Sequence, residues 1–123
     1  MELIYRAYDG KEFKTAEECI RHDNAIREGV KMWDPQGYRT KDVSMAVVIS
    51  IKDEDSMLAF HQMCYDYAKE THTGEEGAKR LIGGLEPDIS GYFMWDEGRE
   101  EYRWLDEDII LPIVSLAREE GFV

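Results

Sequence analysis

The chain has 123 residues, of which 43% are hydrophobic, enough for a single folded domain with a buried core. It carries 27 acidic and 15 basic residues, and the net charge of −12 disfavours nucleic acid and anionic membranes and favours a basic partner or a cation. No apolar run reaches the roughly 20 residues that span a bilayer, and the first residues lack the layout of a signal peptide. The cysteines Cys19 and Cys64 are far apart, so we expect no disulfide framework and a reducing cytoplasm.

Two short strands and a helix are predicted at the start of the chain. Residues 2–8 and 11–13 carry the strands, joined by a two-residue Asp-Gly turn that is typical of a hairpin. A capping box formed by Thr15 and Glu18 then predicts the start of a helix, because the two side chains satisfy free backbone amides. We expect this helix to end at Gly29 in the left-handed conformation.

The stretch from Tyr5 to His22 has the pattern Y-x-A-x-D-G-K-E-F-x-T-x-E-E-C-x-x-H. It resembles the opening of many small bacteriophage-encoded accessory proteins, which begin with an aromatic strand, a DG turn, a Phe and a helix carrying E-E/A-C-x-x-H/Y. The resemblance covers 18 of the 123 residues. It implies a small phage accessory protein, a class that includes inhibitors of host defence such as anti-CRISPR-like proteins.

The middle of the chain contains its most apolar run, Val43–Ile51, whose β-branched residues predict a buried central strand. Acidic residues at 53–55 follow and are typical of a helix start. Apolar residues then recur at helical spacing over Met57–His72, the longest predicted helix. A further short helix is expected over 75–82, ended by two glycines.

A second hairpin and a last helix are predicted near the end of the chain. Residues 89–95 and 100–105 carry its strands, and we expect Trp95 and Tyr102 to form an aromatic pair across them. The last helix begins after acidic residues at 106–108. Its predicted apolar face contains Ile109, Ile110, Ile113, Val114, Leu116 and Ala117.

These elements follow the order ββαβα(α)ββα and predict one α+β domain over residues 1–123. We expect an antiparallel sheet of about five strands with the helices packed on one face. The segment Met32–Tyr38 is rich in turn signals and is expected to be a connection. Its Trp33 and Tyr38 either cap the core or stand exposed as contact residues.

Two Cys–His pairs raise the question of a zinc site. Cys19 and His22 share one face of a predicted helix, and so do His61 and Cys64. Two such helices meeting would provide a tetrahedral set of ligands. The alternative is that the cysteines are small core residues and the histidines lie at the boundary of the core.

Two acidic triplets suggest either a metal-dependent hydrolase or a pair of helix caps. Clustered carboxylates can hold magnesium, but acidic residues at helix starts also satisfy free amides. The triplets are Asp53-Glu54-Asp55 and Asp106-Glu107-Asp108. A Cys–His nucleophile would lack an orienting third group, and no phosphate-binding motif is present, so we expect neither catalysis nor a cofactor.

The strongest functional pattern in the sequence is a cluster of acidic residues near the C-terminal hairpin. Seven acidic residues occur within the thirteen residues 96–108, opposed only by Arg99 and Arg103. Such a surface mimics nucleic acid and can occupy a basic groove built for phosphates, with exposed aromatic residues as energetic anchors. The predicted contact residues are Asp96, Glu97, Glu100, Glu101, Tyr102, Trp104, Asp106, Glu107 and Asp108, together with Trp33 and Tyr38.

The sequence therefore favours a non-enzymatic cytoplasmic binding module. We expect a phage-type inhibitor that covers a basic, nucleic-acid-handling surface of a host defence complex. One alternative is a small-ligand sponge, in which aromatic residues stack a nucleobase and Arg80, Arg99 or Arg103 holds phosphate. A metal-dependent hydrolase is the other alternative, and the sequence leaves the partner and any self-association open.

Overall fold

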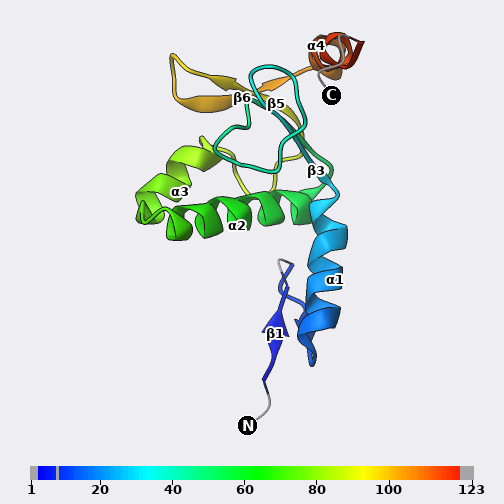
Figure 1. Ribbon diagram of the computed structural model, residues 1–123, viewed down its shortest axis with the longest axis vertical. Coiled ribbons are helices and arrows are strands. Elements are labelled where there is room, and N and C mark those ends of the chain that lie inside the picture. Colours follow the sequence, from blue (N-terminus) through cyan, green and yellow to red (C-terminus); the bar gives the residue numbers. More distant parts are fainter. Residues whose placement is uncertain (1–2, 8, 120–123) are drawn as a thin grey trace.

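A four-stranded antiparallel sheet forms the centre of the structure (Figure 1). Its strands lie in the order β3 (Val30–Trp33), β4 (Val48–Ile51), β5 (Gly91–Asp96) and β6 (Glu101–Leu105). The computed structural model describes residues 3–7 and 9–119, with residues 114–119 as backbone only.

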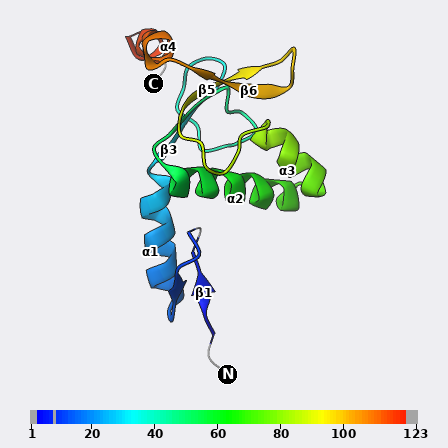
Figure 2. The same cartoon turned by 180° about the vertical axis from the view of Figure 1, so that it is seen from behind.

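The N-terminal hairpin pairs β1 (Tyr5–Arg6) with β2 (Glu12–Phe13), as the Asp-Gly turn predicts. It is followed by α1 (Ala16–Arg27), whose Thr15 hydroxyl accepts a hydrogen bond from the Glu18 amide at 3.2 Å, confirming the predicted cap. Figure 2 shows the hairpin and α1 extending away from the main sheet. The strands are thus divided between two sheets, of two and four strands, within the expected antiparallel α+β class.

The other helices are α2 (Glu54–Glu70), α3 (Gly74–Ile82) and α4 (Glu107–Glu119). Helices α2 and α3 lie along one side of the main sheet, whereas α4 lies on the other side (Figure 1). The arrangement of helices on one face therefore does not extend to α4. Its Ile110 packs with Trp33 and Val48, whose side chains alternate away from α2.

The main core lies between β3–β6 and the helices α2 and α3. Phe60 and Phe93 are fully buried within it, and the Tyr102 hydroxyl donates a hydrogen bond of 2.8 Å to the Ala46 carbonyl. The Trp95 and Tyr102 rings lie 5.1 Å apart in an edge-to-face arrangement, which confirms the predicted cross-strand pair. The core includes Val30, Met32, Ile49, Ile51, Met57, Cys64, Ile82 and Leu85.

The central strand is shorter than predicted. Only Val48–Ile51 of the apolar run forms a strand. As predicted, this strand is central, because it lies between β3 and β5. Residues 43–45 form a turn, because the Asp42 carboxylate accepts hydrogen bonds from the Ser44 amide and hydroxyl at 2.9 and 2.6 Å. Such local bonds compete with sheet pairing. The Val47 amide donates to the Trp33 carbonyl, and the Val47 carbonyl accepts from the Trp95 amide, at 2.8 Å each. Val43 and Ala46 remain buried, so the run contributes to the core without forming a strand.

Strand β3 was not predicted. The turn signals of the Met32–Tyr38 segment begin only after Trp33, where the Asp34 carboxylate accepts from the Gln36 and Tyr38 amides at 2.9 Å each. The expected connection therefore starts two residues late. A strand of four residues next to such a turn has too few alternating positions to be recognised.

Gly29 also departs from the prediction, since it does not adopt the left-handed conformation. Its backbone lies directly against the first turn of α2, and an added Cβ would collide with Ser56 Oγ. The Lys52 amide donates to the Gly29 carbonyl at 3.0 Å. Glycine is therefore required by close packing between α1 and α2 rather than by backbone conformation.

Replacing Gly29 with alanine tests this contact. We expect Gly29→Ala to lower the free energy of unfolding by about 1–3 kcal/mol, because the new methyl group overpacks a rigid junction. Urea denaturation measures the change. Gly98→Ala is the matched control, since its Cβ would sit 3.4 Å from Asp96 Oδ1 in an exposed turn, and a change within about 0.5 kcal/mol is expected. Equal effects of the two substitutions would contradict the close-packing account.

Candidate functional site

The acidic tip of the β5–β6 hairpin is built around one structural carboxylate. Asp96 Oδ1 accepts from the Gly98 and Arg99 amides at 3.0 and 3.3 Å, and Asp96 Oδ2 lies 3.5 Å from the Arg103 guanidinium. Asp96 therefore holds the turn together. Glu97 and Glu100 project outward and form no ion pair within the described part of the chain, so they are the acids that the tip offers to a partner.

The seven acids of residues 96–108 do not form one patch. Four lie at the hairpin tip, whereas Asp106, Glu107 and Asp108 lie at the other end of β6, where α4 begins. The five residues of β6 place the two groups about 17 Å apart. A partner must span this distance to contact both groups, or it must use one of them.

The aromatic residues predicted as contacts divide into two exposed and two buried side chains. Trp104 is 59% exposed, and Tyr38 also lies at the surface. Trp33 and Tyr102 are buried, Trp33 against Ile110 and Tyr102 in the main core. Trp33 thus takes the core-capping alternative, and the burial of Tyr102 removes it from the predicted contact residues.

Helix α4 presents an apolar surface that the sequence pattern did not reveal. Ile109, Leu111 and Ile113 are 51%, 40% and 43% exposed, and among the described side chains of the helix only Ile110 is buried. The pattern places Ile109, Ile110 and Ile113 on one face, but the face of the sheet covers only Ile110 among them. Three apolar side chains are therefore exposed immediately after the acidic triplet.

The acidic triplets both begin helices, but their capping differs in detail. Asp53 Oδ1 accepts from the Ser56 amide and hydroxyl at 2.8 Å each, and these hydrogen bonds hold the pKa of Asp53 below its usual value. At α4 the Asp106 carbonyl accepts from the Ile109 amide at 2.9 Å. Capping thus accounts for the first triplet, and no metal-binding cluster exists among the described residues.

The proposed zinc ligands are engaged elsewhere. Cys64 is fully buried in the main core, and burial raises the pKa of its thiol to about 12. Burial, together with the carboxylate of Asp23, also raises the pKa of Cys19. His61 packs edge-on to Phe60, and burial lowers its pKa. These surroundings keep both thiols protonated, which disfavours the zinc site and equally a cysteine nucleophile.

His22 instead pairs with Asp9. His22 Nε2 lies 2.7 Å from Asp9 Oδ2, and the Phe13 ring lies 5.1 Å from the imidazole. Twelve residues separate Asp9 from His22 in the chain. Their hydrogen bond links the N-terminal hairpin to α1.

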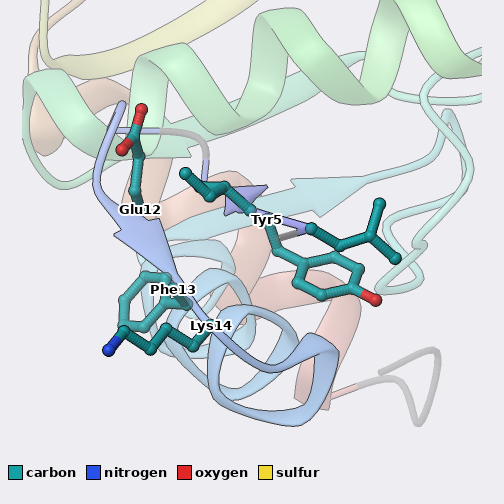
Figure 3. Close-up of a pocket in the computed structure, with 6 residues that line it drawn as sticks. Tyr5, Glu12, Phe13 and Lys14 are labelled. Atoms are coloured by element: carbon teal, nitrogen blue, oxygen red, sulfur yellow. The ribbon is translucent and has the colours of Figure 1, made fainter. Parts of the chain in front are cut away.

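A shallow hollow of about 510 Å³ lies at the end of the hairpin away from its turn. Figure 3 shows Tyr5 on β1 and Glu12, Phe13 and Lys14 along β2 and the turn after it. Leu3 and Ile4 complete the lining and are strongly exposed. The hollow is open and has one acidic and one basic side chain at its edge, so it shows no preference for a charged ligand.

The arginines expected to hold phosphate lie on separate elements. Arg80 belongs to α3, Arg99 lies 3.9 Å from Glu101, and Arg103 lies against Asp96. The last two are thus partly neutralised by the acids of their own hairpin. The structure does not group these three residues into a phosphate site.

Comparison of the chain with protein-family models, with curated proteins and with solved structures finds no match. Among the described residues, every helix is too short or too polar to pass through a lipid bilayer.

The Asp9–His22 pair gives a testable pH dependence. Burial raises the pKa of Asp9, but hydrogen bonds from His22 and the Lys11 amide outweigh it and hold the pKa below 3.8. The stabilisation is therefore complete above that value and is lost as pH falls through the lower folded pKa. We expect Asp9→Asn to lower the opening free energy of α1 by about 1–2 kcal/mol at pH 7, measured by amide hydrogen exchange, and to match the wild type only once the pH falls below the lowered folded pKa of Asp9.

Glu17→Gln is the control for this experiment, since Glu17 is an exposed acid in the first turn of the same helix. It should leave the exchange rates nearly unchanged. Zinc chelators should have no effect on the wild type. A loss of protection on chelation, or an effect of Asp9→Asn that does not diminish as the solution is acidified below pH 3.8, would contradict the assignment.

Proposed function

We propose that this protein is a non-enzymatic binding module that docks on a basic protein surface through residues 96–113. The observation that carries the proposal is the exposed apolar start of α4, with Ile109, Leu111 and Ile113 directly after three exposed acids. Apolar side chains supply affinity on burial, whereas surrounding acids select a basic partner and accelerate its approach.

The distribution of charge supports the same surface. Residues 96–113 contain seven acids and two arginines, a net charge of −5 in 18 residues. Arg99 and Arg103 each lie close to another acid of the hairpin, so among the described residues Glu97 and Glu100 have no ion-pair partner. Trp104 is exposed on β6 but shares the sheet face of its cross-strand partner Phe93, opposite to α4, so we do not include it in this surface.

We also propose what kind of protein the partner is. A strongly acidic surface matches a protein groove built for phosphates, so we propose a nucleic-acid-handling complex as the target. The resemblance of the stretch Tyr5–His22 to phage accessory proteins supports a host defence complex and an inhibitory role. The two unbridged thiols support action in a reducing cytoplasm.

The electrostatic part of the proposal is tested with a partner captured from a bacterial lysate and then purified. We expect its affinity for the wild type to fall steeply between about 50 mM and 0.5 M salt, because surface charges are screened. Glu107→Gln/Asp108→Asn and Glu97→Gln/Glu100→Gln should weaken binding at low salt, each by about tenfold or less. Their affinities should approach that of the wild type at high salt.

Glu75→Gln/Glu76→Gln is the matched control, because it removes two charges from the first turn of α3. It should change the affinity only slightly. The partner should also lose nucleic-acid binding when the protein is added. An affinity that does not depend on salt, or equal effects of all three double variants, would overturn the proposed surface.

The apolar part is tested separately. We expect Ile109→Ser to weaken the same complex by about five- to twentyfold at every salt concentration, because burial of an exposed isoleucine contributes roughly 1–2 kcal/mol. Ile20→Ser is the control, since Ile20 is similarly exposed at 58% but lies on α1. Calorimetry measures both affinities. A larger loss of affinity for Ile20→Ser than for Ile109→Ser would contradict the proposal and place the interface at α1.

A further inference from the structure

A second hollow, of about 450 Å³, lies on the face of the main sheet that carries α4. Lys31, Ser50 and Tyr92 are direct neighbours across β3, β4 and β5, in the row next to Trp33 and Val48. Helix α4 covers the Trp33–Val48 row through Ile110 and leaves the neighbouring row open. The volume falls within the range of small-molecule sites.

The lining of this hollow is mainly basic, whereas the chain as a whole is acidic. Lys31 and Lys52 place two ammonium groups at it, Ser50 and Ser90 add two hydroxyls, and Glu28 is its one acidic lining residue among those described. Within the described part of the chain, the side chains of these lysines and serines form no ion pair or hydrogen bond, although the Asp53 carboxylate interacts electrostatically with Lys52. Their donors are therefore available to an anion in a protein whose net charge is −12.

Tyr92 defines the other end of the hollow. Its ring packs against the Trp33–Val48–Ile110 cluster and remains partly exposed toward the open row. Leu105 lies opposite Tyr92 on β6, and the acids of 106–108 follow it directly. These acids repel a phosphate from the Tyr92 end, so an anionic group is drawn toward Lys31 and Lys52.

We propose that this hollow binds a nucleoside monophosphate. The phosphate lies between Lys31 and Lys52, with the hydroxyls of Ser50 and Ser90 as further donors, and the base lies against the Tyr92 ring. Ammonium and hydroxyl groups satisfy phosphate oxygens with charge-assisted hydrogen bonds, and base–aromatic stacking is tolerant of the base. This site differs from the three arginines expected from the sequence, and it does not require that residues 96–113 dock on a partner.

Isothermal titration calorimetry with adenosine 5′-monophosphate tests the site, with adenosine and inorganic phosphate as separate probes. We expect the nucleotide to bind more tightly than either probe alone. Lys31→Ala and Lys52→Ala should each weaken nucleotide binding about tenfold, because each removes a charged hydrogen-bond donor. Lys69→Ala, an exposed lysine in the last turn of α2, should leave binding unchanged.

Tyr92→Leu separates the two parts of the ligand, since leucine keeps apolar packing against the neighbouring cluster but removes the aromatic ring. Its affinity for the nucleotide should fall to that for inorganic phosphate, while circular dichroism shows an unchanged fold. Equal binding of nucleotide and phosphate by the wild type would overturn the nucleotide assignment. Absence of binding at millimolar nucleotide, or unchanged affinity in both lysine variants, would overturn the site itself.

Discussion

The structure depends on the packing of β4 against α2. Ile49 in the strand and Phe60 in the helix are both fully buried, and β3 and β5 pair on either side of that strand. This burial offsets the mutual repulsion of a chain with a net charge of −12. It also leaves the far face of the sheet free of α2 and α3, and both the exposed start of α4 and the lysine-lined hollow belong to that face.

The elements with local chemical signals were predictable. Thr15 and Asp53 were predicted at the starts of α1 and α2 because their side-chain oxygens can accept hydrogen bonds from free helix amides. The Trp95–Tyr102 pair was predicted because side chains alternate along the two strands that flank a turn. Strand β3 escaped prediction because it has only four residues before a turn. The length of β4 was overestimated because apolar content alone does not reveal the turn that Asp42 forms.

The candidate site was only partly predictable, since a sequence pattern gives the face of an element but not its neighbour. Seven acids close together in sequence are separated by the length of β6. The apolar pattern of α4 predicted burial, yet the sheet covers Ile110 and leaves Ile109 exposed. The row formed by Lys31, Ser50 and Tyr92 joins three strands and depends on their register, which no local pattern contains.

The central claim is that residues 96–113 form the partner-binding surface. Amide hydrogen–deuterium exchange of the free protein and of its complex with the captured partner tests it most directly. We expect slower exchange in the complex over residues 96–113, with the exchange of β1, β2 and α1 unchanged. Protection confined to the N-terminal hairpin and α1, with residues 96–113 exchanging as in the free protein, would contradict it.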